Sequence, residues 1–275
     1  QILFSVIARQ SRDGGWYHGE WTDLMESHYR YHNGAMHLLE SALEEDGPDD
    51  TVRTALESAA SFITNYTDQT TLGLWFLHDS LEESVEGMDE CWKQTGGKWL
   101  PSRILGKSPT NKLILNTHLD TTIALHRYRA VTGDNRYTDD VDSAHSAACS
   151  SLRLKPAERL YRIVYRAIGL TLLPESEAMS LPLPVRALKR LTANYLVPQL
   201  HRIKRRYPRF VMPGGLIERH LAPLHFNIQY HAVNTMDLAR LLRCFPDDDL
   251  ADILDNAVTF VTANNILQYW SESKP

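Results

Sequence analysis

The sequence predicts an all-α fold, and three observations carry that prediction. Apolar residues recur at helical spacing in roughly nine or ten segments, no stretch alternates as a strand would, and Gly-Gly loops precede helices of similar pattern. The chain has 275 residues, of which 43% are apolar and 23% charged, as in globular proteins with a packed core. We therefore expect a helical domain whose organisation follows an internal repeat.

The helix boundaries follow from apolar periodicity and from stop signals such as Gly47 and Gly133. The chain begins with Gln1 inside a helical pattern, so we expect it to be a piece of a longer protein. The helices expected in chain order cover residues 2–10, 25–47, 51–66, 79–94, 111–134, 135–152, 156–173, 184–207, 224–245 and 248–270.

An internal repeat is the most informative feature of the sequence. In each unit a Gly-Gly pair and an apolar residue precede a helix that carries a histidine near its start. The apolar residues are Trp16, Trp99 and Leu216, and the histidines are His32, His118 and His231. The two positions are 16, 19 and 15 residues apart in the three units, so the order and spacing are similar.

Repeated helical hairpins of this kind predict a ring whose inner helices run in the same direction. The starts of the inner helices and the loops before them then gather at one end of the ring. Only glycine permits the sharp loop that leads from an outer helix to an inner one. Loop aromatics and groups near the inner-helix starts should therefore line the mouth of a central cavity.

The segment NTHLDTTIALHRYRAVTGD (116–134) resembles the inner helix and turn of the (α/α) toroid superfamily. This superfamily includes six-hairpin glycosidases, unsaturated-glucuronyl hydrolases, and the helical domains of uronate lyases and glucuronyl C5-epimerases. The chain also looks like toroid proteins encoded with bacterial polysaccharide biosynthesis systems. The resemblance covers most of residues 1–150 and 207–270 and concerns architecture. It implies a single toroid domain over residues 1–275, incomplete because fewer than six hairpins are present, with 153–206 as an insertion.

The loop SRDGGWYHGEW (11–21) places polar-tipped aromatic side chains beside a Gly-Gly pair. Sugar rings present apolar faces to aromatic side chains and hydroxyl edges to polar ones, so the loop suits the lip of a saccharide site. In the alternative interpretation, Trp16 plugs the core and Asp13 organises the turn. The substrate-binding residues expected here are Asp13, Trp16, Tyr17, His18, Glu20 and Trp21.

The repeat predicts that its three histidines face the central cavity, where histidine can donate or accept a proton near neutral pH. A uronate lyase or epimerase removes the proton next to a carboxylate, whereas a hydrolase needs two separated carboxyl groups. Asp120 is the best-placed acid. In the alternative interpretation, the histidines are packed polar groups that bond neighbouring helices. The expected catalytic residues are His118, Asp120, His32 and His231, and the expected binding residues near them are Asn33, Asn116, Glu218, Tyr230 and Asn234.

Metal and terpenoid chemistry are less favoured. No HExxH motif or Cys/His cluster is present and the three cysteines stand far apart, so we expect no metal and no cofactor. QSRDGGW (10–16) resembles the Gln-Trp repeat of triterpene cyclases, and DDLAD (248–252) matches the DDxxD of terpene synthases. The latter motif opens a helix, where acids serve as caps. A terpenoid cyclase-like toroid is therefore kept as an alternative.

The segment 153–209 is strongly basic. It holds 13 Lys/Arg and three acids, a net charge of +10, so the other 218 residues carry −15. In 159–171, apolar residues lie on one broad helical face and arginines on another. This segment suits an anionic membrane surface or an acidic polysaccharide, or it packs on the ring as an ordinary helical hairpin with solvated charges. No nucleic-acid-binding motif is present, so we expect no nucleic-acid partner.

Together these patterns predict a carbohydrate-active protein of polysaccharide synthesis or modification that acts on an acidic glycan. The leading prediction is an enzyme of the lyase, epimerase or glycoside hydrolase type. The alternative is a non-catalytic glycan-binding or scaffold protein, peripheral to a membrane-bound assembly through its basic segment. A cytoplasmic or membrane-peripheral location fits both.

Overall fold

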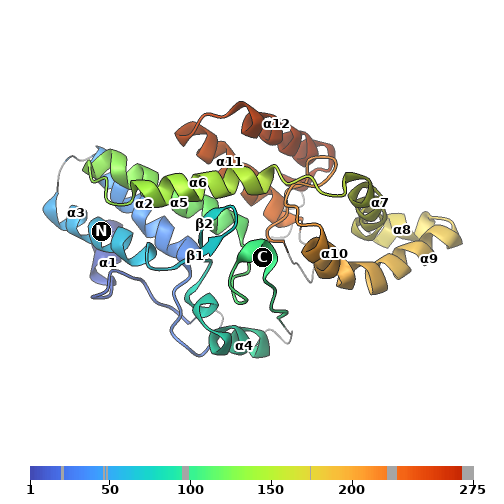
Figure 1. The fold of residues 1–275 in the computed structure, drawn as a ribbon, viewed down its shortest axis with the longest axis horizontal. Helices are drawn as coiled ribbons and strands as arrows, with labels where there is room; N and C mark the ends of the chain where they lie inside the picture. Colours follow the sequence, from blue (N-terminus) through green and yellow to red (C-terminus); the bar gives the residue numbers. More distant parts are fainter. Residues whose placement is uncertain are drawn as a thin grey trace. The chain divides into compact units, whose positions relative to one another are not determined.

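In a computed structural model the chain folds as helices joined by short turns and by longer loops, such as the one from α1 to α2 (Figure 1). The described residues also form a two-stranded hairpin. The predicted all-α class of repeated helical hairpins is confirmed. The chain divides into two compact units, Gln1–Ser150 with Arg240–Phe245, and Ser151–Ala239 with Pro246–Pro275. Across the described residues no helix is long and apolar enough to cross a bilayer. The structure describes residues 1–19, 22–45, 47, 49–94, 99–173, 175–221 and 228–267.

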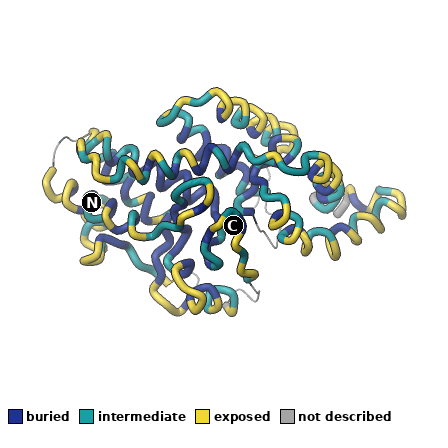
Figure 2. The backbone as a smooth tube through the Cα atoms, in the orientation of Figure 1, coloured by how far each residue is buried: buried dark blue, intermediate teal, exposed yellow. Residues whose placement is uncertain are grey.

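The first unit is built from two helical hairpins, α2–α3 and α5–α6, with shorter elements around them. Its core contains apolar side chains of α2, α3, α5 and α6, among them Leu39, Leu56 and Tyr128. Figure 2 shows buried stretches of backbone in these helices. The elements are α1 (Ile2–Ala8), α2 (Tyr29–Glu45), α3 (Asp50–Ile63), β1 (Thr67–Thr70), β2 (Gly73–Phe76), η1 (Ser80–Glu83), α4 (Val85–Gln94), η2 (Ile104–Gly106), α5 (Leu115–Thr132) and α6 (Thr138–Leu152).

Helix α5 is one of the two inner helices of the first unit, and it is buried on all sides along most of its length. Polar residues such as Asn116, His118 and Asp120 are buried together with the apolar ones. Buried polar groups need hydrogen-bond partners, so this helix concentrates the polar contacts of the unit. Gly133, in the left-handed conformation at φ 73°, ends it as the sequence predicts.

A short β-hairpin follows α3, ahead of η1, α4 and η2, and was not expected from the sequence. Its antiparallel register pairs Thr67 with Phe76 and Thr70 with Gly73. Four residues a strand are too few for an alternating pattern to be recognised in the sequence. The segment expected as one helix over 79–94 is also divided, because Ser84 is extended and its hydroxyl caps α4 by accepting from Gly87 N (2.9 Å).

The second unit contains the basic segment and the third helical hairpin. Helix α11 begins in this unit, and its last turn, from Arg240, belongs to the first unit. Asp247 caps α12 by accepting from Leu250 N at 3.0 Å, and this cap explains the acidic run that follows Pro246. The elements are α7 (Glu158–Gly169), η3 (Leu170–Leu172), α8 (Glu175–Ser180), α9 (Leu183–Leu191), η4 (Thr192–Leu196), η5 (Val197–Gln199), α10 (Leu200–Arg206), α11 (Gln229–Cys244) and α12 (Asp248–Ala263).

Candidate functional site

The three repeat histidines join each inner helix to the outer helix of its own hairpin. Every one is fully buried, and its Nε2 lies at hydrogen-bond distance from the backbone oxygen of an alanine on the outer helix. The pairs are His32–Ala59 at 3.0 Å, His118–Ala144 at 3.0 Å and His231–Ala257 at 2.9 Å. The three hairpins therefore share one anchoring contact, which we call the histidine anchor.

The second ring nitrogen of two anchors is also bonded. Nδ1 of His118 accepts from Phe76 N (3.1 Å), and Nδ1 of His231 accepts from Ile217 N (2.9 Å). Nε2 must then carry the proton and donate it to the alanine oxygen. Burial lowers the pKa of His118 to about 3 and that of His32 to about 4, so both rings are neutral at physiological pH. A catalytic role for these residues stays a prediction, whereas their contacts give them a structural one.

A glycine accompanies each anchor, at the point where the preceding loop crosses the outer helix. The residue that precedes the anchoring alanine in the outer helix points its backbone oxygen at this glycine. A Cβ on the glycine would lie 2.1–2.7 Å from that oxygen, so a residue larger than glycine does not fit. The pairs are Gly14 with Ser58, Gly73 with Ser143, and Gly215 with Asn256. For the second repeat the sequence predicted that the Gly-Gly pair before Trp99 plays this part, and that pair lies outside the described residues. In the structure the glycine that crosses the outer helix of the second repeat is Gly73.

This correction has a sequence signal behind it. Gly73 and Trp75 repeat the spacing of Gly14 and Trp16, and the Trp75 ring stacks on His118 at 3.9 Å. Trp99 instead donates its indole N–H to Asp89 at 2.6 Å. The three repeats are therefore present as predicted, but the loop of the second repeat is the one at Gly73 and not the one before Trp99.

The loop before α2 is held by its own contacts. Trp16 donates to Val6 O (2.9 Å), and its ring lies against His32. Asp13 accepts from Gly15 N (3.1 Å) and from the Tyr17 hydroxyl (2.6 Å). These contacts match the alternative in which Trp16 plugs the core and Asp13 organises the turn. Stacking of sugar on this loop stays a prediction, and Glu20 and Trp21 lie outside the described residues.

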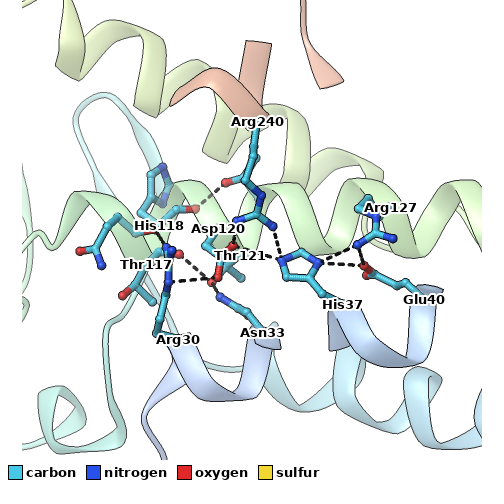
Figure 3. A network of polar contacts seen from close by, with 12 residues as sticks. Arg30, Asn33, His37, Glu40, Thr117, His118, Asp120, Thr121, Arg127 and Arg240 are labelled. Carbon is cyan, nitrogen blue, oxygen red and sulfur yellow. Dashed lines mark hydrogen bonds and ion pairs between the residues drawn. The ribbon is translucent and has the colours of Figure 1, made fainter. Parts of the chain in front are cut away.

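Asp120 lies at the centre of a charged network on the inner helices (Figure 3). One of its oxygens is 2.5 Å from Arg240 Nη1 and 3.1 Å from His37 Nε2, and the other is 3.5 Å from Arg30 Nε. The Asp120 side chain is 3% exposed, whereas those of the two arginines are about one-fifth exposed, at 20% and 23%. The carboxylate is thus enclosed by cations that solvent reaches in part.

His37 bridges Asp120 to a second buried carboxylate. Its Nδ1 is 2.9 Å from Glu40 Oε2, which Arg127 Nη1 also approaches at 3.0 Å. Burial opposes the charged ring, but hydrogen bonds to Asp120 and Glu40 together raise the pKa of His37 above its usual value. A doubly protonated His37 can donate to both carboxylates at once. Arg127 Nη1 and Arg240 Nη2 also lie 3.1 Å and 2.7 Å from its Nδ1 and Nε2, so the ring sits between cations as well as carboxylates.

The two carboxyl groups differ in acidity. Burial favours the neutral form of Asp120, but His37 and the neighbouring arginines lower its pKa to about 2. Burial raises the pKa of Glu40, and its Oε1 has no hydrogen-bond partner among the described residues. Two carboxyl groups with pKa values moved apart are a common feature of acid–base sites. We call Arg30, His37, Glu40, Asp120, Arg127 and Arg240 the Asp120 cluster.

Polar amides line the same inner helices. Asn33 Nδ2 donates to Thr121 Oγ1 (2.8 Å), and the backbone oxygen of Asn116 accepts from Arg30 (2.9 Å). Both asparagines are buried, and their side-chain oxygens have no hydrogen-bond partner among the described residues. The structure thus brings the predicted residues Asn33, Asn116 and Asp120 together.

Imidazole and aromatic rings gather at the start of α2. The rings of His28 and Tyr31 stack at 4.8 Å, and His18 and His78 lie 5.3 Å from Tyr31 and 4.3 Å from His28, respectively. This group connects to the Asp120 cluster because His28 Nδ1 accepts from Arg30 N at 3.2 Å. Tyr31 is 56% exposed and so offers a ring face on which a sugar could stack.

The remaining predicted binding residues belong to the second unit. Glu218 forms a buried ion pair with Lys204, and burial raises its pKa. The guanidinium of Arg219 lies over the Tyr230 ring at 4.1 Å, and Asn234 donates to Ile217 O at 3.2 Å. Each of these residues thus has a partner within its own unit.

No group of three or more His, Cys, Asp or Glu in the described part of the chain could hold a metal ion.

The second unit has a pocket of about 800 Å³ with a mainly apolar lining, to which Arg162 and Arg166 add positive charge. This lining suits an apolar group with an anionic end.

Sequence reasoning found Asp120 but missed the residues that surround it. The signal was present, because the polar residues of α2 recur every three or four positions and so share one helical face. The repeat indicates the histidine positions and not this polar face, so it did not predict these residues. The missed residues on α2 are Arg30, His37, Glu40 and Glu44.

No protein-family model matches the chain, and no curated protein sequence does. Among solved structures it is similar to a sugar epimerase from a ruminal bacterium, with 10% identity, 95% of this chain and 71% of that chain covered, and a TM-score of 0.38. It is also similar to cellobiose 2-epimerase from Spirochaeta thermophila DSM 6192, with 12% identity, 95% and 82% covered, and a TM-score of 0.25. Likenesses of this size do not assign an activity, which has to be argued from the geometry.

Proposed function

We propose that this chain binds a saccharide that carries a carboxylate, and that it catalyses a lyase or epimerase reaction at the Asp120 cluster. The observation that carries the proposal is the group of three arginines and His37 around two buried carboxylates. With His37 protonated, four positive charges face these two carboxylates and the partly exposed Glu44, which pairs with Arg127. An anionic ligand would balance the excess charge.

The arrangement suits chemistry next to a carboxylate. Removing the proton beside a uronate carboxylate places negative charge on that group, and arginines can stabilise it through paired hydrogen bonds. Arg30 and Arg240 are the proposed carboxylate-binding residues because both are partly exposed. Asp120 orients their guanidinium groups and His37. His37 is the proposed proton carrier, because its neutral ring can accept the proton of the C–H bond. In a lyase the resulting imidazolium gives this proton to the leaving oxygen, and in an epimerase it returns the proton to solvent while the carbon takes one from solvent on its other face. The exposed ring of Tyr31, backed by the buried ring of His28, is the proposed stacking surface for a neighbouring sugar.

The first test is thermal unfolding with neutral and uronate-containing oligosaccharides. A bound ligand at about 100 times its dissociation constant should add about 2.7 kcal/mol to the free energy of unfolding. We expect uronates to stabilise the chain and neutral oligosaccharides to have no effect. Arg240→Gln should weaken uronate binding about tenfold or more, because a charge-assisted bond contributes roughly 1.5–3 kcal/mol. Arg53→Gln is the matched control, since that arginine pairs with Glu57 on the exposed side of α3.

The reaction type is tested in deuterated solvent with the uronates that bind. A lyase or epimerase breaks the C–H bond next to the carboxylate, so an epimerase incorporates solvent deuterium and a lyase forms an unsaturated uronate. New reducing ends without either change would indicate a hydrolase instead. Binding without turnover would support the non-catalytic glycan-binding alternative, and the absence of any saccharide binding would contradict the proposal.

The predicted membrane-peripheral role is a second proposal, and a specific observation favours it. The basic segment exposes large apolar side chains, among them Leu183 and Tyr195 at 75% and 69%. This surface belongs to the second unit and does not depend on the Asp120 cluster.

A further inference from the structure

The sequence predicted that the apolar face within residues 159–171 could contact a membrane, but much of that face is buried in the structure. On α7, Tyr161, Val164 and Ile168 are buried, and the last two pack with Leu200 of α10. Leu160 and Ile163 are exceptions, with 37% and 69% exposed. Helix α7 thus uses its apolar face within the second unit, as in the ordinary helical hairpin that was the alternative.

Helix α9 and the two turns after it present a different face. Along α9, η4 and η5 apolar residues recur at alternating spacings of four and three, the spacing that follows one side of an α-helix such as α9. Every one of them is exposed, with Leu188 at 47%, Leu191 at 56% and Tyr195 at 69%. We call these residues the α9 stripe: Pro184, Leu188, Leu191, Tyr195 and Pro198.

The charges beside the α9 stripe are all positive. From Ala178 to Arg206 the chain contains seven Lys/Arg and no Asp or Glu. One of these cations, Lys204, is buried in its pair with Glu218, but Arg190, Arg202 and others are exposed. An exposed apolar stripe with exclusively cationic neighbours is typical of a helix that lies in the interface of an anionic membrane.

We propose that the α9 stripe docks this protein on an anionic lipid bilayer, with the helix axis parallel to the surface. The apolar side chains enter the boundary between headgroups and acyl chains, and the neighbouring cations bind lipid phosphates. A second copy of the chain fits less well, because a two-fold interface would bring the same cations face to face. The proposal is independent of the saccharide site.

The test is flotation of the whole chain with two kinds of vesicle, phosphatidylcholine alone and phosphatidylcholine mixed with phosphatidylglycerol. We expect binding to the anionic vesicles only, and release by salt as the charges are screened. Equal binding to both vesicles, or to neither, would overturn the proposal. Concentration-dependent dimers that disappear when the stripe is made polar would also overturn it, in favour of self-association.

Two sets of variants separate the apolar and the cationic contributions. The combination Leu188→Ser, Leu191→Ser and Tyr195→Ser should lower the partition coefficient at least about tenfold through lost apolar burial. Arg190→Gln and Arg202→Gln should each lower it about fivefold. Val258→Ser is the matched control, because Val258 is equally exposed, at 47%, on the acidic helix α12. Equal losses from the control and the stripe variants would contradict docking through the α9 stripe.

Discussion

The histidine anchors and the Asp120 cluster occupy the same inner helices and are both buried and polar, yet their chemistry is opposite. The anchors are neutral, fully enclosed and bonded to backbone atoms. The cluster is charged, and solvent reaches its arginines. His32 and His37 are five residues apart on α2, but burial lowers the pKa of the first and carboxylates raise that of the second.

The difference shows how one helix serves two purposes. Residues that face the outer helix must satisfy backbone groups in a tightly packed interface, so a neutral ring suits them. Residues on other faces of the helix meet the side chains of further inner helices, where charges can be paired. Position around the helix, and not residue type, therefore separates the structural histidines from the candidate catalytic one.

The largest expected effect is a decrease in the free energy of unfolding as the pH falls, and it tests whether the anchors are neutral and the cluster charged. His32 and His118 have folded pKa values of about 4 and about 3, below the unfolded value of about 6.5. Protons therefore bind the unfolded chain first as the pH falls below about 6.5. The free energy of unfolding should then decrease by about 1.4 kcal/mol per pH unit for each histidine, until the folded pKa is reached.

His37 should act in the opposite direction. Its folded pKa is raised, so its contribution to stability is fully present below about pH 6.5 and is lost as the pH rises through the folded value. Urea unfolding of wild type and His37→Gln across this range measures both effects. A wild-type stability that stays flat below pH 6.5 would mean that the anchors are not enclosed as described.

The next effect separates the anchors from the cluster by mutation. His118→Ala removes the bonds to Ala144 and Phe76 and the stack on Trp75, so it should cost about 3 kcal/mol of unfolding free energy. His37→Gln, in a partly exposed site, should cost about 1 kcal/mol and act mainly on saccharide turnover. Denaturant titration beside the activity assay distinguishes the two, and the reverse pattern would assign catalysis to His118.

A smaller effect tests the corrected repeat. Gly73→Ala would place Cβ 2.7 Å from Ser143 O at a φ of +134°, so it should cost about 2 kcal/mol. Gly34→Ala is the control, because this helical glycine has no neighbour within 4 Å of the added carbon and should gain about 0.5–1 kcal/mol. Both are read from thermal unfolding. Equal effects would show that the loop does not cross α6 closely at Gly73.

Much of the fold follows from local sequence patterns. Apolar spacing predicted the hairpins α2–α3, α5–α6 and α11–α12, since the period of a helix can be read along the chain. The equivalence of the three histidines was also visible. Gly73 was missed because its short strands carry no periodicity, and Arg240 because it lies 120 residues from Asp120.

The sequence by itself determined the helical class, the repeat and the basic segment, because these depend on composition and short-range spacing. Only the tertiary structure decided which polar residues meet. It gave the histidines backbone partners, brought Arg30, Arg127 and Arg240 around the carboxylates, and buried the apolar face of α7 while leaving that of α9 exposed. The physical reason is that charge pairing and burial depend on neighbours from distant parts of the chain, which a helical pattern does not specify.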